Sequence, residues 1–387
     1  MIKVIKNLFV GSFIILTIIF MIIEPENVIN GVKTAIMLWA TNVFPVLFPF
    51  YIFSTLAIKR GVAHFLGEVI HPLTRRLFKT SSISGFVFIM SLLSGNPSSA
   101  IIISQLYEEG SITKKEAQHL LSFSVFTNPL FCIGTIGITY FKNASIGYVV
   151  LISHILANII IGILMRYNNK GQLHKKYSIK KAYEKMVIQK QKNKENFSET
   201  ITHILQNGIN TMFLICSFMI FYNIIIVMIE SSRLSHISYQ SIEFLYNIIP
   251  LDFATYNSFF IGVFEMVLGI DNVINSSFSI RTTVMIITML VSFGGLSIHS
   301  QIHSILYKVK LKYSPFLISR IAQMLFSGII AYYIFPIIYN EKTIKTSKII
   351  NIHEKDRNIL LISIVLLLIT LLFFISHRKE KRCNLHL

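Results

Sequence analysis

Cysteine is nearly absent from this chain, and its three cysteines offer neither a disulfide framework nor a thiolate metal site. Cys132, Cys216 and Cys383 have no metal-ligand spacing. The first two fall in apolar segments, where cysteine packs as a small buried side chain. The chain also lacks the nucleotide-binding pattern Gly-x-x-x-x-Gly-Lys-Ser/Thr, which argues against ATP-driven pumping. We expect no enzyme activity, no cofactor and no bound metal.

Acidic residues are scarce as well. The chain has 18 Asp and Glu against 36 Lys and Arg, a formal net charge of +18. Such an excess can indicate nucleic-acid binding, but here the positive charges lie in loops beside apolar segments. That distribution is typical of the cytoplasmic loops of membrane proteins. We therefore expect a lipid bilayer as partner, and no nucleic acid.

Apolar residues are what the sequence has in abundance: 53% are hydrophobic and the mean hydropathy is +0.62. Because about 20 apolar residues cross a bilayer as a helix, we predict an all-α polytopic membrane protein with about eight full crossings. No small-residue cleavage site follows the first apolar run, so we expect a retained helix rather than a signal peptide. The candidate crossings are 4–23, 31–58, 117–140, 144–166, 202–230, 282–306, 314–338 and 359–376.

Two further apolar stretches, 83–106 and 255–278, are interrupted by polar residues. The first contains SGNPSSA at 94–100, and the second contains GVFEM at 262–266. Irregular backbone at membrane depth is tolerated only inside protein or beside a wet cavity. We predict that each stretch forms a re-entrant hairpin. Counting both as non-crossing places four basic clusters and both termini in the cytoplasm, although the basic loop 340–357 then falls outside.

A weak internal repeat supports this arrangement. Residues 151–155, LISHI, recur as LISRI at 317–321, and Asn128-Pro129-Leu130 aligns at the same offset with Gly294-Gly295-Leu296. With three crossings plus one hairpin each, the two copies would be inverted, as in many secondary transporters. The predicted units are an N-terminal helix (1–29), a first inverted repeat (30–167), a basic cytoplasmic linker (168–200), a second inverted repeat (201–340), and a C-terminal helix with a basic tail (341–387).

Polar residues at the interruptions are the candidate solute ligands. Half-helix N-termini at the first hairpin would offer free N–H groups. Gly294-Gly295 should unwind the crossing 282–306, and Asn128-Pro129 should do the same in 117–140. An intramembrane carboxylate is costly and usually functional, so Glu265 is the candidate for coupling to a proton or cation. The predicted solute-binding residues are Asn96, Ser98, Ser99, Asn128, Ser297, His299, Gln301 and Arg320.

Three of the charged features leave alternatives open. His299 and His303 lie four residues apart, a metal-ligand spacing, but no third ligand accompanies them. Arg320 either binds an anionic group of the solute or reaches the cytoplasmic surface along its helix. The linker 168–200 is basic and partly amphipathic, which favours a surface helix on anionic lipid.

Four segments resemble a known family: VFPVLFPF within 40–58, IHPLTRRLF at 70–78, residues 94–131, and SFGGLSIHSQ at 292–301. They resemble the YlbJ-type sporulation integral membrane proteins, which belong with the nucleoside-recognition (Gate) proteins related to concentrative nucleoside transporters. Where typical members read Gly-Tyr-Pro-x-Gly-Ala at the first hairpin, this chain reads GNPSSA. The resemblance implies a role in endospore formation, in moving the anion dipicolinate towards the forespore. We therefore predict a membrane transporter of a small anionic solute. The residues themselves leave open a nucleoside-like solute, a non-transporting scaffold, and assembly into a homo-oligomer.

Overall fold

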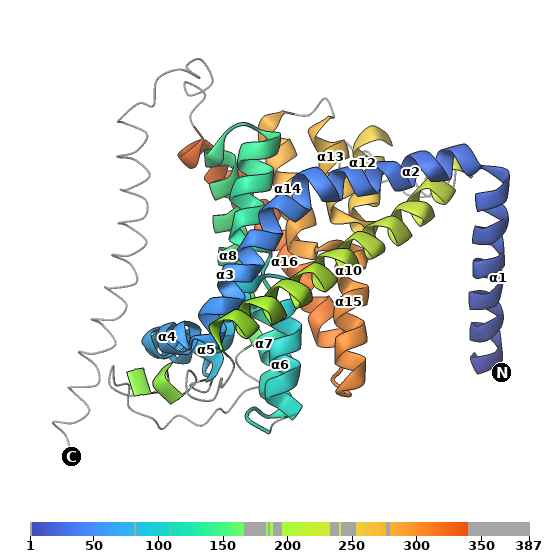
Figure 1. Cartoon of the computed structure of the whole chain (residues 1–387). Helices are drawn as coiled ribbons and strands as arrows, with labels where there is room; N and C mark the ends of the chain where they lie inside the picture. Colours follow the sequence, from blue (N-terminus) through green and yellow to red (C-terminus); the bar gives the residue numbers. More distant parts are fainter. Residues whose placement is uncertain are drawn as a thin grey trace.

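A computed structural model describes residues 2–80, 83–108, 110–165, 183–184, 186–188, 196–232, 240, 253–275 and 279–339. All regular elements in these residues are helices, which confirms the all-α prediction (Figure 1). The N-terminal elements are α1 (Ile2–Ile23), α2 (Pro25–Leu38), the π-helix η1 (Trp39–Val43), α3 (Phe44–Lys59) and α4 (Val62–Phe78).

Each half of the rest contains a broken pair of helices, then a broken longer helix and then an unbroken long helix, and the second half begins with an additional long helix. In the first half these are α5 (Ile83–Ser94) with α6 (Ser98–Glu108), α7 (Lys114–Phe123) with the π-helix η2 (Phe131–Tyr140), and α8 (Ala144–Met165). The long helix α10 (Phe197–Ser231) opens the second half. It is followed by α12 (Phe253–Phe264) with α13 (Met266–Ile274), α14 (Ile280–Phe293) with α15 (Gly295–Lys308), and α16 (Ser314–Ile338).

Among the described residues, five helical segments are long and apolar enough to cross a membrane. They are Pro25–Ala57, Ala144–Met165, Phe197–Ser231, Ile280–Lys308 and Ser314–Ile338. Val10–Ile23, Ser84–Ser94 and Phe131–Tyr140 are shorter apolar helices. The predicted crossing 359–376 lies outside the described residues, so a total of about eight crossings stays a prediction.

The distribution of side chains is that of a membrane protein. Large apolar side chains face outward, as at Leu8 and Ile337, which are 68% and 80% exposed. Polar side chains of α8 and α16, among them Asn158 and Gln323, are completely buried. In lipid this arrangement is favourable because polar groups find partners only inside the protein.

The predicted interruptions are found. The stretch 83–106 breaks between Ser94 and Ser98, and 255–278 breaks at Glu265. In the crossing 282–306, α14 ends at Phe293 because Gly294 and Gly295 take the left-handed conformation, with φ of 91° and 70°. Re-entry of the two broken pairs into a membrane stays a prediction.

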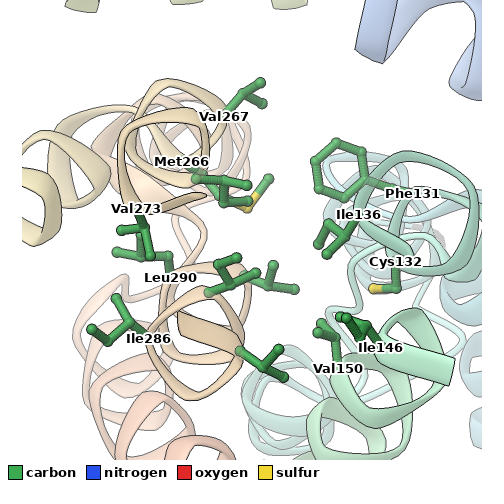
Figure 2. Close-up of a cluster of buried hydrophobic side chains, with 14 of the residues drawn as sticks. Phe131, Cys132, Ile136, Ile146, Val150, Met266, Val267, Val273, Ile286 and Leu290 are labelled. Atoms are coloured by element: carbon green, nitrogen blue, oxygen red, sulfur yellow. The ribbon is translucent and has the colours of Figure 1, made fainter. Parts of the chain in front are cut away.

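The two broken pairs lie at opposite ends of the molecule. In Figure 1, α5 and α6 are at the bottom, whereas α12 and α13 are at the top. Figure 2 shows where the halves join: Met266, Val267, Val273, Ile286 and Leu290 face Phe131, Cys132, Ile136, Ile146 and Val150 across one hydrophobic core. This placement is what inverted repeats require, and the repeat itself remains a prediction.

The arrangement makes a topology prediction that labelling can check. The turn between α6 and α7 lies at the bottom of Figure 1, and the turn between α1 and α2 lies at the top. In a background without cysteine, Ser111→Cys should react with an impermeant maleimide only from the cytoplasmic side, and Glu26→Cys only from the opposite side. Both positions are exposed. Labelling of both cysteines from one side would contradict the topology.

Candidate solute site

A cavity of about 70 Å³ lies where the four interruptions meet. Its wall is built from the tip between α5 and α6, the segment between α7 and η2, the start of α13, and the first turns of α15. Side chains of η1, α3 and α10 close it. The lining residues are Val43, Leu47, Tyr51, Ser94, Asn96, Ser98, Thr127, Asn128, Phe131, Thr211, Met212, Ile215, Met219, Glu265, Met266, Val267, Ser297, Ile298 and Gln301.

Six of the nine residues predicted to bind the solute or the coupling ion line this cavity. Asn96, Ser98, Asn128, Glu265, Ser297 and Gln301 line it, whereas Ser99, His299 and Arg320 do not. The meeting of the four segments is therefore an observed feature of the fold. The role of the lining residues in binding a solute stays a prediction.

Asn128 joins the first hairpin tip to the unwound segment after α7. Its Nδ2 donates to the carbonyl of Leu93 (3.4 Å), and its Oδ1 accepts from the backbone N–H of Leu130 (2.7 Å). A Cβ atom at Gly95 would lie 3.0 Å from that of Asn128, so only glycine lets the two segments approach this closely. Ser99 is buried behind the tip, with its hydroxyl 3.5 Å from Oδ1 of Asn96.

Glu265 is the N-cap of α13 and is 4% exposed. Its Oε2 accepts from the N–H of Leu268 at 2.8 Å, and the N–H of Val267 also points to the carboxylate. The helix N-terminus therefore stabilises a negative charge here through backbone dipoles. Among the described lining residues, Glu265 is the only carboxylate, and no Lys, Arg or His accompanies it.

Ser297 and Gln301 lie four residues apart on α15, on one face of the helix, and both reach the cavity. His299 points away from it. Its Nε2 donates to the carbonyl of Phe293 (3.0 Å), so its Nδ1 accepts from the hydroxyl of Tyr313. His299 thus satisfies a carbonyl that the break at Gly294 leaves without a helical partner. Among the described residues no group of three His, Cys, Asp or Glu side chains could hold a metal ion.

Arg320 neither lines the cavity nor reaches the surface, since it is 2% exposed. Its guanidinium donates to the carbonyls of Ser122 (2.9 Å) and Val125 (2.9 Å), and to Oδ1 of Asn158 (3.0 Å). Ser122 and Val125 lie where α7 ends, so these carbonyls lack the next helical turn. An arginine of the second half therefore holds the unwound segment of the first half in place.

His154 completes this connection, and its role was not predicted from the sequence. Its Nε2 accepts from the N–H of Thr127 (3.1 Å), so Nδ1 carries the proton and donates to Oγ of Ser292 (3.0 Å). Oγ1 of Thr127 in turn donates to the carbonyl of Val291 (3.1 Å). The unwound segment after α7 is thus tied to the last turn of α14, just before the break at Gly294, through buried polar groups. The signal in the sequence was a His and an Arg at matching places in two apolar helices.

Helix α10 also contributes lining residues that the sequence did not indicate. Thr211, Met212, Ile215 and Met219 follow one face of this helix and close the cavity. In the sequence they are part of an apolar run with the period of any membrane helix, and Thr211 is the one polar residue among them. The contribution of α10 to the cavity could therefore be recognised only from the fold.

The comparisons with known proteins agree with the resemblance found in the sequence. Residues 40–147 match the Gate family model, described as nucleoside recognition. The chain is 27% identical over 333 residues to the sporulation integral membrane protein YlbJ of Bacillus subtilis strain 168, covering 84% of this chain and 82% of that protein. No solved structure matches the chain. The family match includes the first hairpin tip and Asn128, whereas Glu265 and α15 lie outside it.

Proposed function

We propose that this chain is an integral membrane transporter that moves a small polar solute through the cavity between the four interruptions. The observation that carries the proposal is the convergence of four broken helical segments on one cavity with a buried carboxylate. In transporters built from inverted repeats, solute and coupling ion bind at such interrupted helices. The inverted repeat, with three crossings and one re-entrant hairpin in each copy, is part of the proposal.

The setting we propose is endospore formation. It is supported by the similarity to a sporulation integral membrane protein over most of the chain. The membrane would be the cell membrane or the forespore membrane, with both termini in the cytoplasm, as the basic loops favour.

The chemistry of the cavity favours a neutral solute with several hydrogen-bonding groups, such as a nucleoside. The amides of Asn96, Asn128 and Gln301 each offer a donor and an acceptor, and Ser297 offers a hydroxyl. The carboxylate of Glu265 can accept from solute hydroxyls. This solute class also agrees with the description of the family that residues 40–147 match.

Dipicolinate is the second candidate, but its negative charge is unfavourable in this cavity. A dianion beside Glu265 would bring like charges together in a site of low dielectric, where their repulsion is strong. Among the described lining residues no cationic side chain offsets it. We therefore propose that dipicolinate passes only with its charge reduced, by a proton on Glu265 or by a cotransported cation. In either case Glu265 is the coupling group.

Binding by α15 can be tested without disturbing the fold. Within the described part of the chain, the side chains of Ser297 and Gln301 make no hydrogen bond. Ser297→Ala and Gln301→Leu should each weaken binding of the transported solute roughly tenfold, the effect of losing one hydrogen bond, and leave thermal stability unchanged. Titration calorimetry with a nucleoside and with dipicolinate measures this.

The matched control is Ser304→Ala, which removes an exposed hydroxyl from the same helix and should leave affinity unchanged. If all three variants bind the solute equally well, Ser297 and Gln301 of α15 are not part of the binding site. A scaffold that carries no solute would bind neither compound, and its function would tolerate substitutions at both hairpin tips.

A further inference from the structure

Helix α4 buries mainly polar side chains and turns apolar side chains outward, which is the reverse of a helix on the surface of a soluble protein. Its buried face carries the side chains of Glu68, His71, Thr74 and Phe78, and the first three of these are polar. The opposite face carries Val62, Val69 and Leu73 at helical spacing, with Val62 41% exposed and the other two half-buried. A helix that turns apolar side chains outward needs an apolar environment on that side.

The position of α4 identifies this environment. The candidate span Pro25–Ala57 ends just before Lys59, and Gly61, with φ of 76°, turns the chain into α4. A Cβ atom at Gly85 would lie 2.2 Å from the carbonyl oxygen of Gly67, so α4 lies directly against α5. In Figure 1, α4 is seen nearly end-on, whereas α8 and α16 run from top to bottom. Helix α4 therefore lies across the direction of the spans, at the end of one of them.

Positive charges flank both ends of α4. Lys59 and Arg60 precede it, Arg75 and Arg76 lie in its last turn, and Lys79 follows it. The guanidinium of Arg60 lies 5.1 Å from the ring centroid of Phe197, whose side chain is largely exposed. Such a combination of an apolar face, basic ends and exposed aromatic side chains is typical of helices that lie in the interface of anionic membranes.

We propose that α4 lies in the membrane interface and binds the headgroups of anionic phospholipids through Arg75 and Arg76. The apolar face enters the acyl boundary, and the two guanidinium groups at its end meet the phosphates, to which arginine donates well-oriented hydrogen bonds. This site is independent of the transported solute. It also differs from the basic linker 168–200, most of which lies outside the described residues.

Native mass spectrometry of the full-length protein, released from nanodiscs of equal phosphatidylglycerol and phosphatidylcholine, tests this site. The wild-type protein should retain phosphatidylglycerol preferentially. In Arg75→Gln/Arg76→Gln the retention should fall roughly fivefold for each arginine lost. Arg75→Lys/Arg76→Lys keeps the charge and should keep most of the preference.

The matched control is Lys308→Gln/Lys312→Gln, which removes two exposed positive charges, one from the last turn of α15 and one from the loop that follows it. Thermal unfolding in one detergent shows that all variants are folded. We expect that only Arg75→Gln/Arg76→Gln loses the preferential retention of phosphatidylglycerol. Equal loss in both glutamine variants would mean that net charge, not α4, recruits the lipid. Full retention in Arg75→Gln/Arg76→Gln would show that these two arginines do not bind the lipid, and either result overturns the proposal.

Discussion

Replacing Arg320 with alanine is expected to lower the free energy of unfolding by at least about 3 kcal/mol, since each buried acceptor left unpaired costs roughly 1–3 kcal/mol. Three acceptors lose their donor at once: the carbonyls of Ser122 and Val125, and Oδ1 of Asn158. Arg320→Lys should recover only part of the loss, because one ammonium group cannot reproduce the planar fork that reaches all three. Thermal or denaturant unfolding of the purified protein in detergent measures the difference.

Arg281 provides the matched control for this prediction. Its Nε donates to the carbonyl of Tyr332, which lies on α16 as Arg320 does, and its guanidinium lies over the Tyr332 ring. In contrast to the contacts of Arg320, this contact is exposed. Arg281→Ala should therefore cost less than about 1 kcal/mol. If the two alanine variants are equally stable, Arg320 does not hold the unwound segment after α7. If Arg320→Ala folds normally yet loses solute binding, the arginine belongs to the solute site, as the sequence suggested.

Replacing Glu265 with glutamine is expected to reduce accumulation of the solute in proteoliposomes to the level of empty vesicles. Glutamine is almost the same size, and its Oε1 can still accept from the N–H of Leu268, so α13 should keep its cap. What the substitution removes is the charge and the exchangeable proton of the only carboxylate among the described lining residues. Membrane insertion and thermal stability should stay close to those of the wild type.

Glu230→Gln is the control, because it neutralises a carboxylate at the exposed end of α10, where Oε1 accepts from Asn257. That variant should accumulate solute normally. Concentrative uptake by Glu265→Gln at the wild-type rate would show that Glu265 carries neither the coupling ion nor the proton, and the coupling proposal would fail.

The interruptions of the helices could be predicted from the sequence because their causes are local. Gly294 and Gly295 take backbone conformations that other residues avoid, and Pro97 cannot donate a helical hydrogen bond. Glu265 stood out because a carboxylate inside an apolar run is costly wherever the run folds. The four segments that meet at the cavity are therefore the ones that these breaks identify in the sequence.

The contacts of Arg320 and His299 could not be predicted, because they join residues far apart in the sequence. Arg320 binds carbonyls almost 200 positions earlier, and backbone carbonyls leave no trace in a sequence. His299 shares a helix with Ser297 and Gln301 but lies on another face, where it meets Tyr313. A polar residue beside a break can serve either the solute or the broken backbone, and only the fold distinguishes these roles.

Uptake by proteoliposomes with a variant that fills the cavity tests the central claim most directly. Ser98 lines the cavity at the start of α6, and Ser98→Leu adds apolar volume there, whereas Thr41→Leu makes a comparable change on the exposed side of η1. We predict that the wild type and Thr41→Leu take up the same radiolabelled solute, a nucleoside or dipicolinate, and that Ser98→Leu does not. Uptake of that solute by folded Ser98→Leu at the wild-type rate would contradict the claim that the solute passes through this cavity.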